Sequence, residues 1–242
     1  MFEQALIFGT VAAIAGLACT IAELLRPART VAYKQVVPRD TVAFLIYIAA
    51  VTPVAGYFTA KCGALQLHWP TARLPLPARV ILYLLVADLG SYILHRVMHT
   101  RWVWRIHKWH HAPTYMYWFA GVRATVWQQF LFNLPGVFAI PIVGHAPVWL
   151  YYAITAEVIL RNDWMHMNVT WRSNWLEWIF VTPRYHHIHH SADLPRHLGN
   201  FGSLFSIWDR LFGTRIDPDT VTEPLQFGTG EADHPVRVIV GV

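Results

Sequence analysis

The sequence predicts an all-α, multi-span membrane helical bundle of about four to five transmembrane helices, with a helical cap on one side. Two observations support this fold class. Of the 242 residues, 55% are apolar and only 14% are charged, whereas soluble proteins carry roughly 25% charged residues. The apolar residues also gather in long runs, and about 20 apolar residues in a helix cross a bilayer core of ~30 Å.

Five apolar runs are expected to form the bundle: residues 5–25, 41–60, 80–94, 125–144 and 146–160. The first run contains one acid, Glu23, and lacks the positive n-region of a signal peptide, which is the rival interpretation. The second should bend at Pro53 and Gly56. A turn at 144–147 separates the last two runs. Because the last run is short, this pair forms either two crossings or a shallow hairpin.

Basic residues predict the orientation of the bundle. Segments 26–40, 96–123 and 161–242 carry most of the lysines and arginines, and such loops stay in the cytosol. With residue 1 outside, all three segments fall inside. We therefore expect an integral, multi-pass protein of the bacterial inner membrane. No basic run is interleaved with aromatic residues in the manner of an RNA-binding surface, which argues against a nucleic-acid partner.

The histidines carry the chemistry. His95 and His99 follow the third run at a spacing of four, which places both on one helix face. His107, His110 and His111 come next, and offsets of three and four again share a face. All of these lie in segments predicted to be cytosolic. Histidine is the commonest metal ligand among side chains, so the cap is predicted to carry a histidine-rich metal site.

A second triplet strengthens this prediction. The segment around His186, His189 and His190 repeats the pattern R-x-H-x-x-H-H-small of residues 105–112. We interpret the two triplets as two halves of one site. His187 has no counterpart in the first triplet, and is predicted either to support a metal ligand from outside the site or to be a substitute ligand itself.

His166 stands alone after the last apolar run and is predicted to be a ninth ligand. The alternative is a hydrogen-bonded interface histidine. Asn162 lies one turn before it, and because an amide binds metals poorly, Asn162 is predicted to be a neighbour of the metal site.

Nine imidazoles exceed the coordination capacity of one metal, so the sequence predicts a dimetal site. Nitrogen donors suit Fe, Zn, Cu or Ni. Asp88 is the nearest carboxylate, on a stripe with Tyr92, His95 and His99. It is predicted to accept an N–H from His95 or another ligand, or alternatively to contact another span.

The chain resembles the fatty acid hydroxylase superfamily, the group that contains sterol desaturases, C4-sterol methyl oxidases and alkylglycerol monooxygenase. The resemblance runs from about Asp88 to Phe227. It rests on DLGSYILHRVMH (88–99), WRIHKWHH (104–111), WMHMN (164–168), TPRYHHIHHS (182–191), NFG (200–202) and IWDRLFGT (207–214).

This resemblance implies a membrane-embedded enzyme with two iron ions, which uses O2 and two external electrons to hydroxylate or desaturate a lipid such as a sterol or fatty acyl chain. Zinc can occupy the same nitrogen ligands. The predicted metal-binding and catalytic residues are His95, His99, His107, His110, His111, His166, His186, His189 and His190. A histidine found in fatty acid 2-hydroxylases one turn before the equivalent of His166 is replaced here by Asn162.

Because no fused cytochrome b5 domain is recognisable, the expected electron donor is a separate protein of the ferredoxin or cytochrome b5 type, with its reductase. The expected domains are an N-terminal transmembrane hairpin (1–78), a hydroxylase-like di-iron catalytic domain (79–214) and an extended C-terminal tail (215–242). Two alternatives stay open: a metal transporter or sensor, and a zinc-bound non-catalytic relative.

Overall fold

The structure is a computed structural model that describes residues 2–63, 69–193, 196–222 and 224–230. In these residues it is built from helices, turns and loops, with three isolated β-bridges. The α-helices are α1 (Phe2–Leu25), α2 (Tyr33–Ile46), α3 (Thr52–Gly63), α4 (Leu76–Met98), α5 (Trp104–His107), α6 (Val126–Ala139), α7 (Val148–His166), α8 (Pro183–His189) and α9 (Ile207–Leu211). The all-α prediction is confirmed for the described part of the chain.

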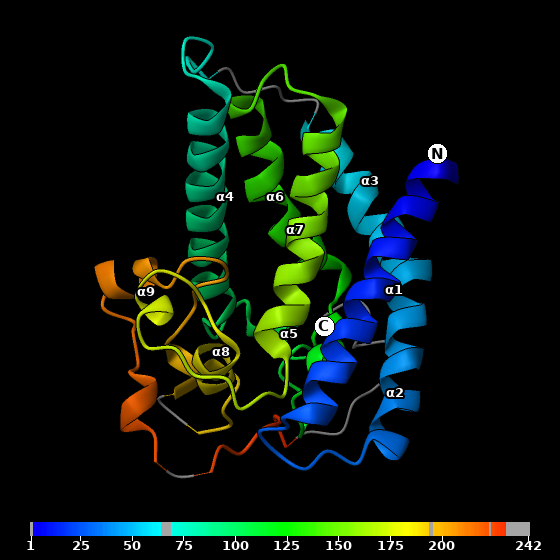
Figure 1. The fold of residues 1–242 in the computed structure, drawn as a ribbon, viewed down its shortest axis with the longest axis vertical. Coiled ribbons are helices and arrows are strands. Elements are labelled where there is room, and N and C mark those ends of the chain that lie inside the picture. Colours follow the sequence, from blue (N-terminus) through cyan, green and yellow to red (C-terminus); the bar gives the residue numbers. More distant parts are fainter. Residues whose placement is uncertain (1, 64–68, 194–195, 223, 231–242) are drawn as a thin grey trace.

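The long helices form a bundle and the short helices lie at one end of it (Figure 1). Helix α6 packs against α3 and α4, and α1 packs against α7. A buried apolar cluster between α4, α7 and the end of α6 includes Tyr83, Ile142 and Leu150. Where α4 meets α6, Gly90 leaves room for Pro135: a Cβ at Gly90 would lie 2.8 Å from the Pro135 ring.

Helices α2 and α3 are joined by a π-helical turn, Tyr47–Val51, and form one continuous helical segment. The irregularity that we expected at Pro53 and Gly56 thus lies just before them. Pro53 has no N–H to donate to the preceding turn, and a local π turn is one of the adjustments that re-satisfy the backbone groups freed by a proline in a membrane helix.

Two helical segments in the described residues are long and apolar enough to cross a membrane, Tyr33–Cys62 and Leu76–Met98. They correspond to the predicted runs 41–60 and 80–94. The other predicted runs form α1, α6 and α7, so the count of four to five crossings stays a prediction. The run 125–144 is not one regular helix, because α6 ends at Ala139 and a 3-10 turn follows at Ile140–Ile142.

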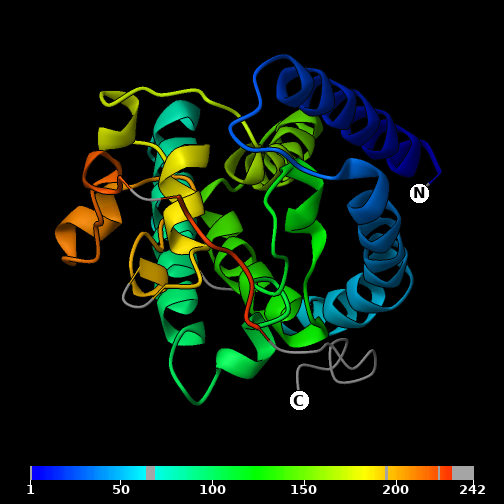
Figure 2. The ribbon, with the colours of Figure 1, turned by 90° about the horizontal axis from the view of Figure 1, so that it is seen from below.

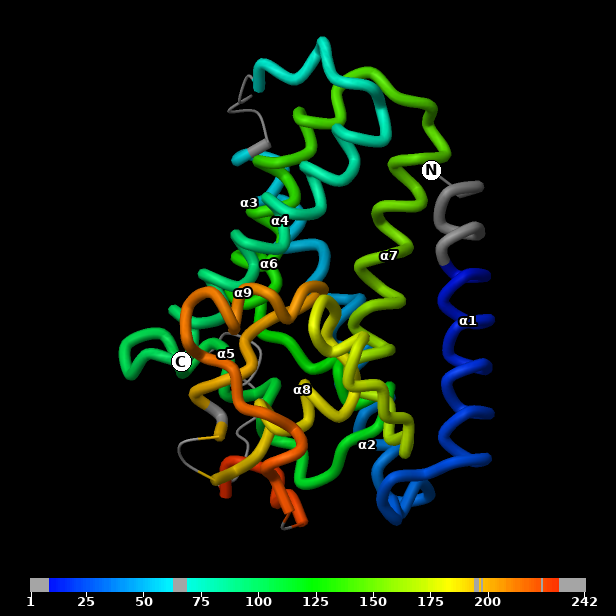
Figure 3. The backbone as a smooth tube through the Cα atoms, turned by 60° about the vertical axis from the view of Figure 1, so that its left-hand side comes forward, coloured from blue at the N-terminus to red at the C-terminus, as the bar shows by residue number. Residues whose placement is uncertain are grey.

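The cap consists of α5, α8, α9 and the loops around them, at the lower ends of α4 and α7, with α9 beside the last turns of α4 (Figure 3). Seen from below, α1 and α2 flank one side of the cap and α9 lies on the opposite side (Figure 2). The first part of the predicted C-terminal tail crosses α8's end, where Ala192 donates its N–H to the carbonyl of Gln226. Residues 231–242 of that tail lie outside the described residues.

Candidate metal centre

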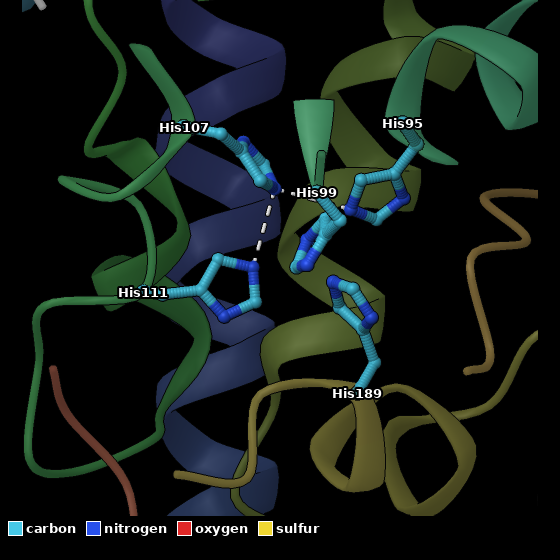
Figure 4. A group of neighbouring side chains, drawn as sticks. All are labelled: His95, His99, His107, His111 and His189. Atoms are coloured by element: carbon cyan, nitrogen blue, oxygen red, sulfur yellow. Dashed lines mark hydrogen bonds between the residues drawn. The ribbon is translucent and has the colours of Figure 1, made fainter. Parts of the chain in front are cut away.

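The nine predicted histidines gather in two groups in the cap. In each group the ligand nitrogens lie within 4.8 Å of one another. The five-histidine group is His95, His99, His107, His111 and His189; the four-histidine group is His110, His166, His186 and His190. Figure 4 shows the rings of the first group turned toward a common centre. Two adjacent groups of this kind match the number of metals expected from the sequence.

The two triplets are divided between the groups. His107 and His111, four residues apart, enter the five-histidine group, whereas His110 enters the other. In the second triplet the assignment is reversed: His186 and His190 enter the four-histidine group and His189 enters the first. Each triplet therefore contributes a pair to one group and a single imidazole to its neighbour.

Local structure explains how these side chains are presented. His95 lies in the last turn of α4, and His99 is the C-cap residue directly after this helix. Helix α8 begins at Pro183, where a missing N–H costs nothing, and the Thr182 hydroxyl accepts the Tyr185 N–H as an N-cap. His190 ends α8. Eight of the nine imidazoles are buried: His95, His107, His110, His111, His166, His186, His189 and His190.

Backbone carbonyls set the tautomers of four imidazoles. In the five-histidine group, the Nδ1 atoms of His95 and His189 lie 2.8 Å from the Phe201 carbonyl and 2.9 Å from the Gly199 carbonyl. A carbonyl can only accept, so each Nδ1 carries the proton, and the Nε2 of the neutral ring keeps a free lone pair. This is the arrangement typical of metal-bound histidine.

The four-histidine group shows the same arrangement, with Nδ1 bonded to a backbone carbonyl and Nε2 free. The Nδ1 atoms of His110 and His166 donate to the carbonyls of Arg123, at 3.1 Å, and Asn162, at 2.7 Å. Their Nε2 atoms face each other at 3.3 Å. Both atoms present lone pairs, which repel unless a cation lies between the rings. The His166 Nε2 also lies 3.3 Å from that of His190. This donor set fits a metal ion.

Burial keeps the imidazoles neutral, as metal binding requires. It lowers the pKa of His110 to about 4. It also lowers the pKa of His107, His111, His186 and His190 well below the usual 6.5, with further contributions from the neighbouring imidazoles. The rings are thus unprotonated near pH 7, and their nitrogens are available as ligands.

Asp88 does not receive the hydrogen bond predicted from His95, because His95 donates to Phe201. The Asp88 carboxylate accepts the backbone N–H groups of Leu204 and Phe205, the Trp208 indole N–H, and the Arg161 guanidinium at 3.1 Å. It joins α4 to α7 and to the loop that follows Phe201. Its role near the histidines is therefore indirect.

His187 lies outside both groups. Its Nδ1 is 2.9 Å from the Arg29 guanidinium, and its Nε2 is 3.3 Å from the His166 carbonyl. Asn162 is a neighbour of His166, because its backbone carbonyl accepts the Nδ1 proton of the His166 ring. Gly121 packs closely against the same ring: a Cβ at this position would lie 2.5 Å from the His166 Nδ1.

Buried polar residues near the site that were not predicted include Glu23, Asp40 and Gln128. Glu23 and Asp40 hydrogen-bond to loops beside the histidines. Gln128 lies in the first turn of α6, where its backbone N–H donates to the Thr125 hydroxyl. The position of Glu23 within an apolar run could have indicated a buried acid with a specific partner. The sequence did not show which residues those partners are, because Trp118 and Asn168 are distant in the chain.

Aromatic residues of α6 approach the site from the bundle side. The Phe132 ring lies 5.7 Å from the ring of His95 and 6.1 Å from that of His107. An apolar cavity of about 370 Å³ lies elsewhere, between the ends of α1 and α7, and is lined by Leu25, Trp164 and Trp171 among others. No histidine lines this cavity, which is thus distinct from the two groups.

Comparison with known proteins decides the family. The fatty acid hydroxylase family matches residues 80–214, more than half of the chain. The chain belongs to this family. All nine histidines lie within the matched part, whereas α1, α2 and α3 lie outside it. The resemblance inferred from the histidine motifs is confirmed.

The chain is similar to family members whose names give different lipid substrates. The chain is 35% identical over 167 residues to the ornithine lipid hydroxylase OlsE of Rhizobium tropici, which covers 66% of this chain and 49% of that protein. It is 30% identical over 128 residues to alkylglycerol monooxygenase of Danio rerio (52% of this chain, 28% of that protein). It is 27% identical over 160 residues to methylsterol monooxygenase 1-3 of Arabidopsis thaliana (62% and 54%).

The chain thus spans about half or less of the length of these fatty acid hydroxylase relatives. No solved structure matches it significantly. The arrangement of the two histidine groups described above therefore comes from this structure alone.

Proposed function

We propose that this chain is a membrane-bound, O2-dependent lipid hydroxylase or desaturase that holds one iron ion in each histidine group. The observation that carries the proposal is the convergence of buried, neutral imidazoles whose Nε2 lone pairs face each other in two adjacent groups. Family membership supports the reaction class, because the relatives named above are hydroxylases and monooxygenases.

Two bound iron ions would supply the activation of O2 with two external electrons, which attack on an unactivated C–H bond requires. The protein's contribution is to hold and orient the ligands. The carbonyls of Phe201, Gly199, Arg123 and Asn162 fix four rings through their Nδ1 protons. Since these acceptors belong to the backbone, the ring orientations depend on the loops.

The substrate is proposed to be a membrane lipid: a sterol, a fatty acyl chain or another lipid, as the names of the relatives suggest. Its chain would approach laterally along α6, which places Phe132 against His95 and leaves Trp127 40% exposed. Apolar side chains on this path would also keep water from the site. The electrons are proposed to come from a donor protein of the ferredoxin or cytochrome b5 type.

The test replaces one histidine of each group separately, His189→Ala and His110→Ala, in the full-length protein. Each variant should lose bound iron and at least 100-fold in product formation. The exposed loop histidine His145 supplies the matched control, His145→Ala. Full iron content and full turnover in either site variant would overturn the site assignment.

Oxygen labelling separates the reaction types. Under 18O2, hydroxylation places one labelled oxygen atom in the lipid, whereas desaturation yields an unlabelled alkene. A protein that retains zinc, consumes no O2 and changes no lipid would instead be a non-catalytic relative.

A further inference from the structure

Helices α1 and α2 lie outside the part of the chain that the family matches, yet each carries a buried acid. Glu23 is 1% exposed and Asp40 is fully buried. A carboxylate in an apolar helix is costly, and such residues pair with specific partners. The partners of these two acids lie in loops next to the histidines.

Asp40 holds Arg123. The Arg123 guanidinium donates from Nε and Nη2 to the Asp40 Oδ1, at 2.9 and 2.7 Å. The hydroxyls of Tyr117 and Tyr115 donate to the Oδ2, at 2.8 and 3.0 Å. One carboxylate thus anchors three side chains of the loop at 115–123.

Arg123 connects this anchor to the metal centre. Its side chain is fixed by Asp40, and its backbone carbonyl accepts the Nδ1 proton of His110. The orientation of the His110 ring is therefore coupled to a carboxylate in α2.

Glu23 fixes the backbone segments that surround His166. Its Oε1 accepts the backbone N–H groups of Asn168 and Trp118, each at 2.7 Å. Asn168 lies two residues after His166. Trp118 begins the 3-10 turn that contains Gly121, which contacts the His166 ring. Glu23 thus fixes the backbone on two sides of this imidazole.

The five-histidine group is held by different residues. His95 and His189 donate to the carbonyls of Phe201 and Gly199. This loop is fixed by Asp209, whose carboxylate accepts the N–H groups of Phe201 and Gly202, each at 2.8 Å. Asp209 belongs to α9, on the side of the cap opposite α1 and α2 (Figure 2).

We propose that Glu23 and Asp40 are positioning residues for the four-histidine group, so that metal binding in this group depends on α1 and α2. Metal binding in the five-histidine group depends on Asp209 instead. The inference rests on the proposed dimetal function. It predicts that the two metals are lost independently, because each group has its own support.

The test compares Asp40→Asn, Glu23→Gln and Asp209→Asn in the full-length protein. Each is loaded anaerobically with Fe(II), and iron per chain is counted over a series of chelator concentrations. Loss of an outer hydrogen-bond partner weakens metal binding about 10–100-fold. Asp40→Asn and Glu23→Gln should therefore lose one of two irons at 10–100-fold lower chelator concentration. Asp209→Asn should weaken the other iron.

Spectroscopy distinguishes positioning from a general loss of structure. Loaded with Mn(II), the wild type should give the electron paramagnetic resonance signal of a coupled pair. Asp40→Asn and Glu23→Gln should give the signal of an isolated ion. Glu157→Gln is the matched control, because Glu157 pairs with Arg161 on α7, and it should keep the coupled signal.

Asp40→Asn leaves the Arg123 charge buried, so the double variant Asp40→Asn/Arg123→Gln is included and should show the same loss of one metal. Wild-type affinity for both metals in Asp40→Asn and Glu23→Gln would overturn the inference, and so would simultaneous loss of both metals. A wild type that binds fewer than two metals would overturn the proposed function itself, which is a separate result.

Discussion

At the scale of single residues, Gly121 is a glycine beside the candidate site that has no room for a side chain. A Cβ there would lie 2.5 Å from the His166 Nδ1, 2.8 Å from its Cγ and 2.9 Å from the Asn162 side-chain nitrogen. Gly121→Ala should therefore displace the His166 ring and remove the metal of the four-histidine group. The strain should cost about 1–3 kcal/mol of stability. Iron content and thermal unfolding measure the two effects.

The control for this substitution is Gly56→Ala, because a Cβ at Gly56 meets no atom within 4 Å. It should keep full iron content and raise stability slightly, since alanine favours a helix. A Gly121→Ala variant with the iron content of the control would contradict the contact with His166.

His187 is predicted to stabilise the metal-free protein in a pH-dependent way. Burial and the adjacent Arg29 lower its pKa from 6.5 to about 3. Between these values the unfolded chain binds a proton that the folded chain does not, so stability falls as the pH drops from 6.5 toward 3. His187→Gln should retain both metals, and its unfolding temperature should fall less between pH 7.5 and 5.0 than that of the wild type. Loss of one metal would contradict the placement of His187 outside both histidine groups.

Residue identities and spacings alone predicted nine site histidines, and the structure brings all nine together. The partners of Glu23, Asp40 and Asp88 could not be predicted in the same way. These carboxylates accept hydrogen bonds from backbone N–H groups and from side chains that are distant in the sequence. Glu23 and Asn168, for example, are 145 residues apart. No local pattern encodes such contacts, which arise when the helices pack.

At the scale of elements, α8 depends on its N-cap. The Thr182 hydroxyl accepts the Tyr185 N–H and donates to the Glu177 carboxylate at 2.8 Å. Thr182→Ala should lower the free energy of unfolding by about 1 kcal/mol, within the 0.5–2 kcal/mol range of such caps. The unfolding temperature checks this. Thr30→Ala, at an exposed loop position, should change it little, and equal stability of both variants would contradict the capping role.

The two histidine-rich segments show how far a repeated sequence pattern predicts local structure. The repeated pattern R-x-H-x-x-H-H predicted equivalent helical turns, but the segment at 183–189 is a regular helix, whereas at 104–111 the helix stops at His107. The difference follows from the flanking sequence, since Thr182 and Pro183 begin α8 with favourable signals that the first segment lacks. The division of each triplet between two groups depends on tertiary packing.

At the scale of the whole molecule, the cap carries an exposed apolar surface. Ile207, Leu211 and Phe212 on and beside α9 are 37%, 65% and 48% exposed, and Trp178 is 63% exposed. The Phe212 ring stacks on Tyr92 of α4, one of the two helical segments long and apolar enough to cross a membrane. We therefore expect α9 to lie in the headgroup region of the leaflet that covers α4.

A fluorophore at Leu211→Cys, in a background with Cys19→Ser and Cys62→Ser, tests this location in lipid vesicles. It should be quenched strongly by lipid-attached nitroxides and weakly by soluble iodide. The same label at Thr222→Cys, an exposed position in the tail, should show the reverse. Iodide quenching at Leu211→Cys equal to that at Thr222→Cys would place α9 in water.

The central claim is that two histidine groups hold two iron ions for O2-dependent oxidation of a lipid. Its most direct test is Mössbauer spectroscopy of the full-length protein loaded anaerobically with 57Fe(II), followed by exposure to O2 and one turnover with membrane lipid. We predict two ferrous ions per chain with nitrogen-rich ligation, both oxidised together as product forms. One iron or none per chain, or two irons that O2 leaves unchanged in the presence of electrons and lipid, would contradict the account.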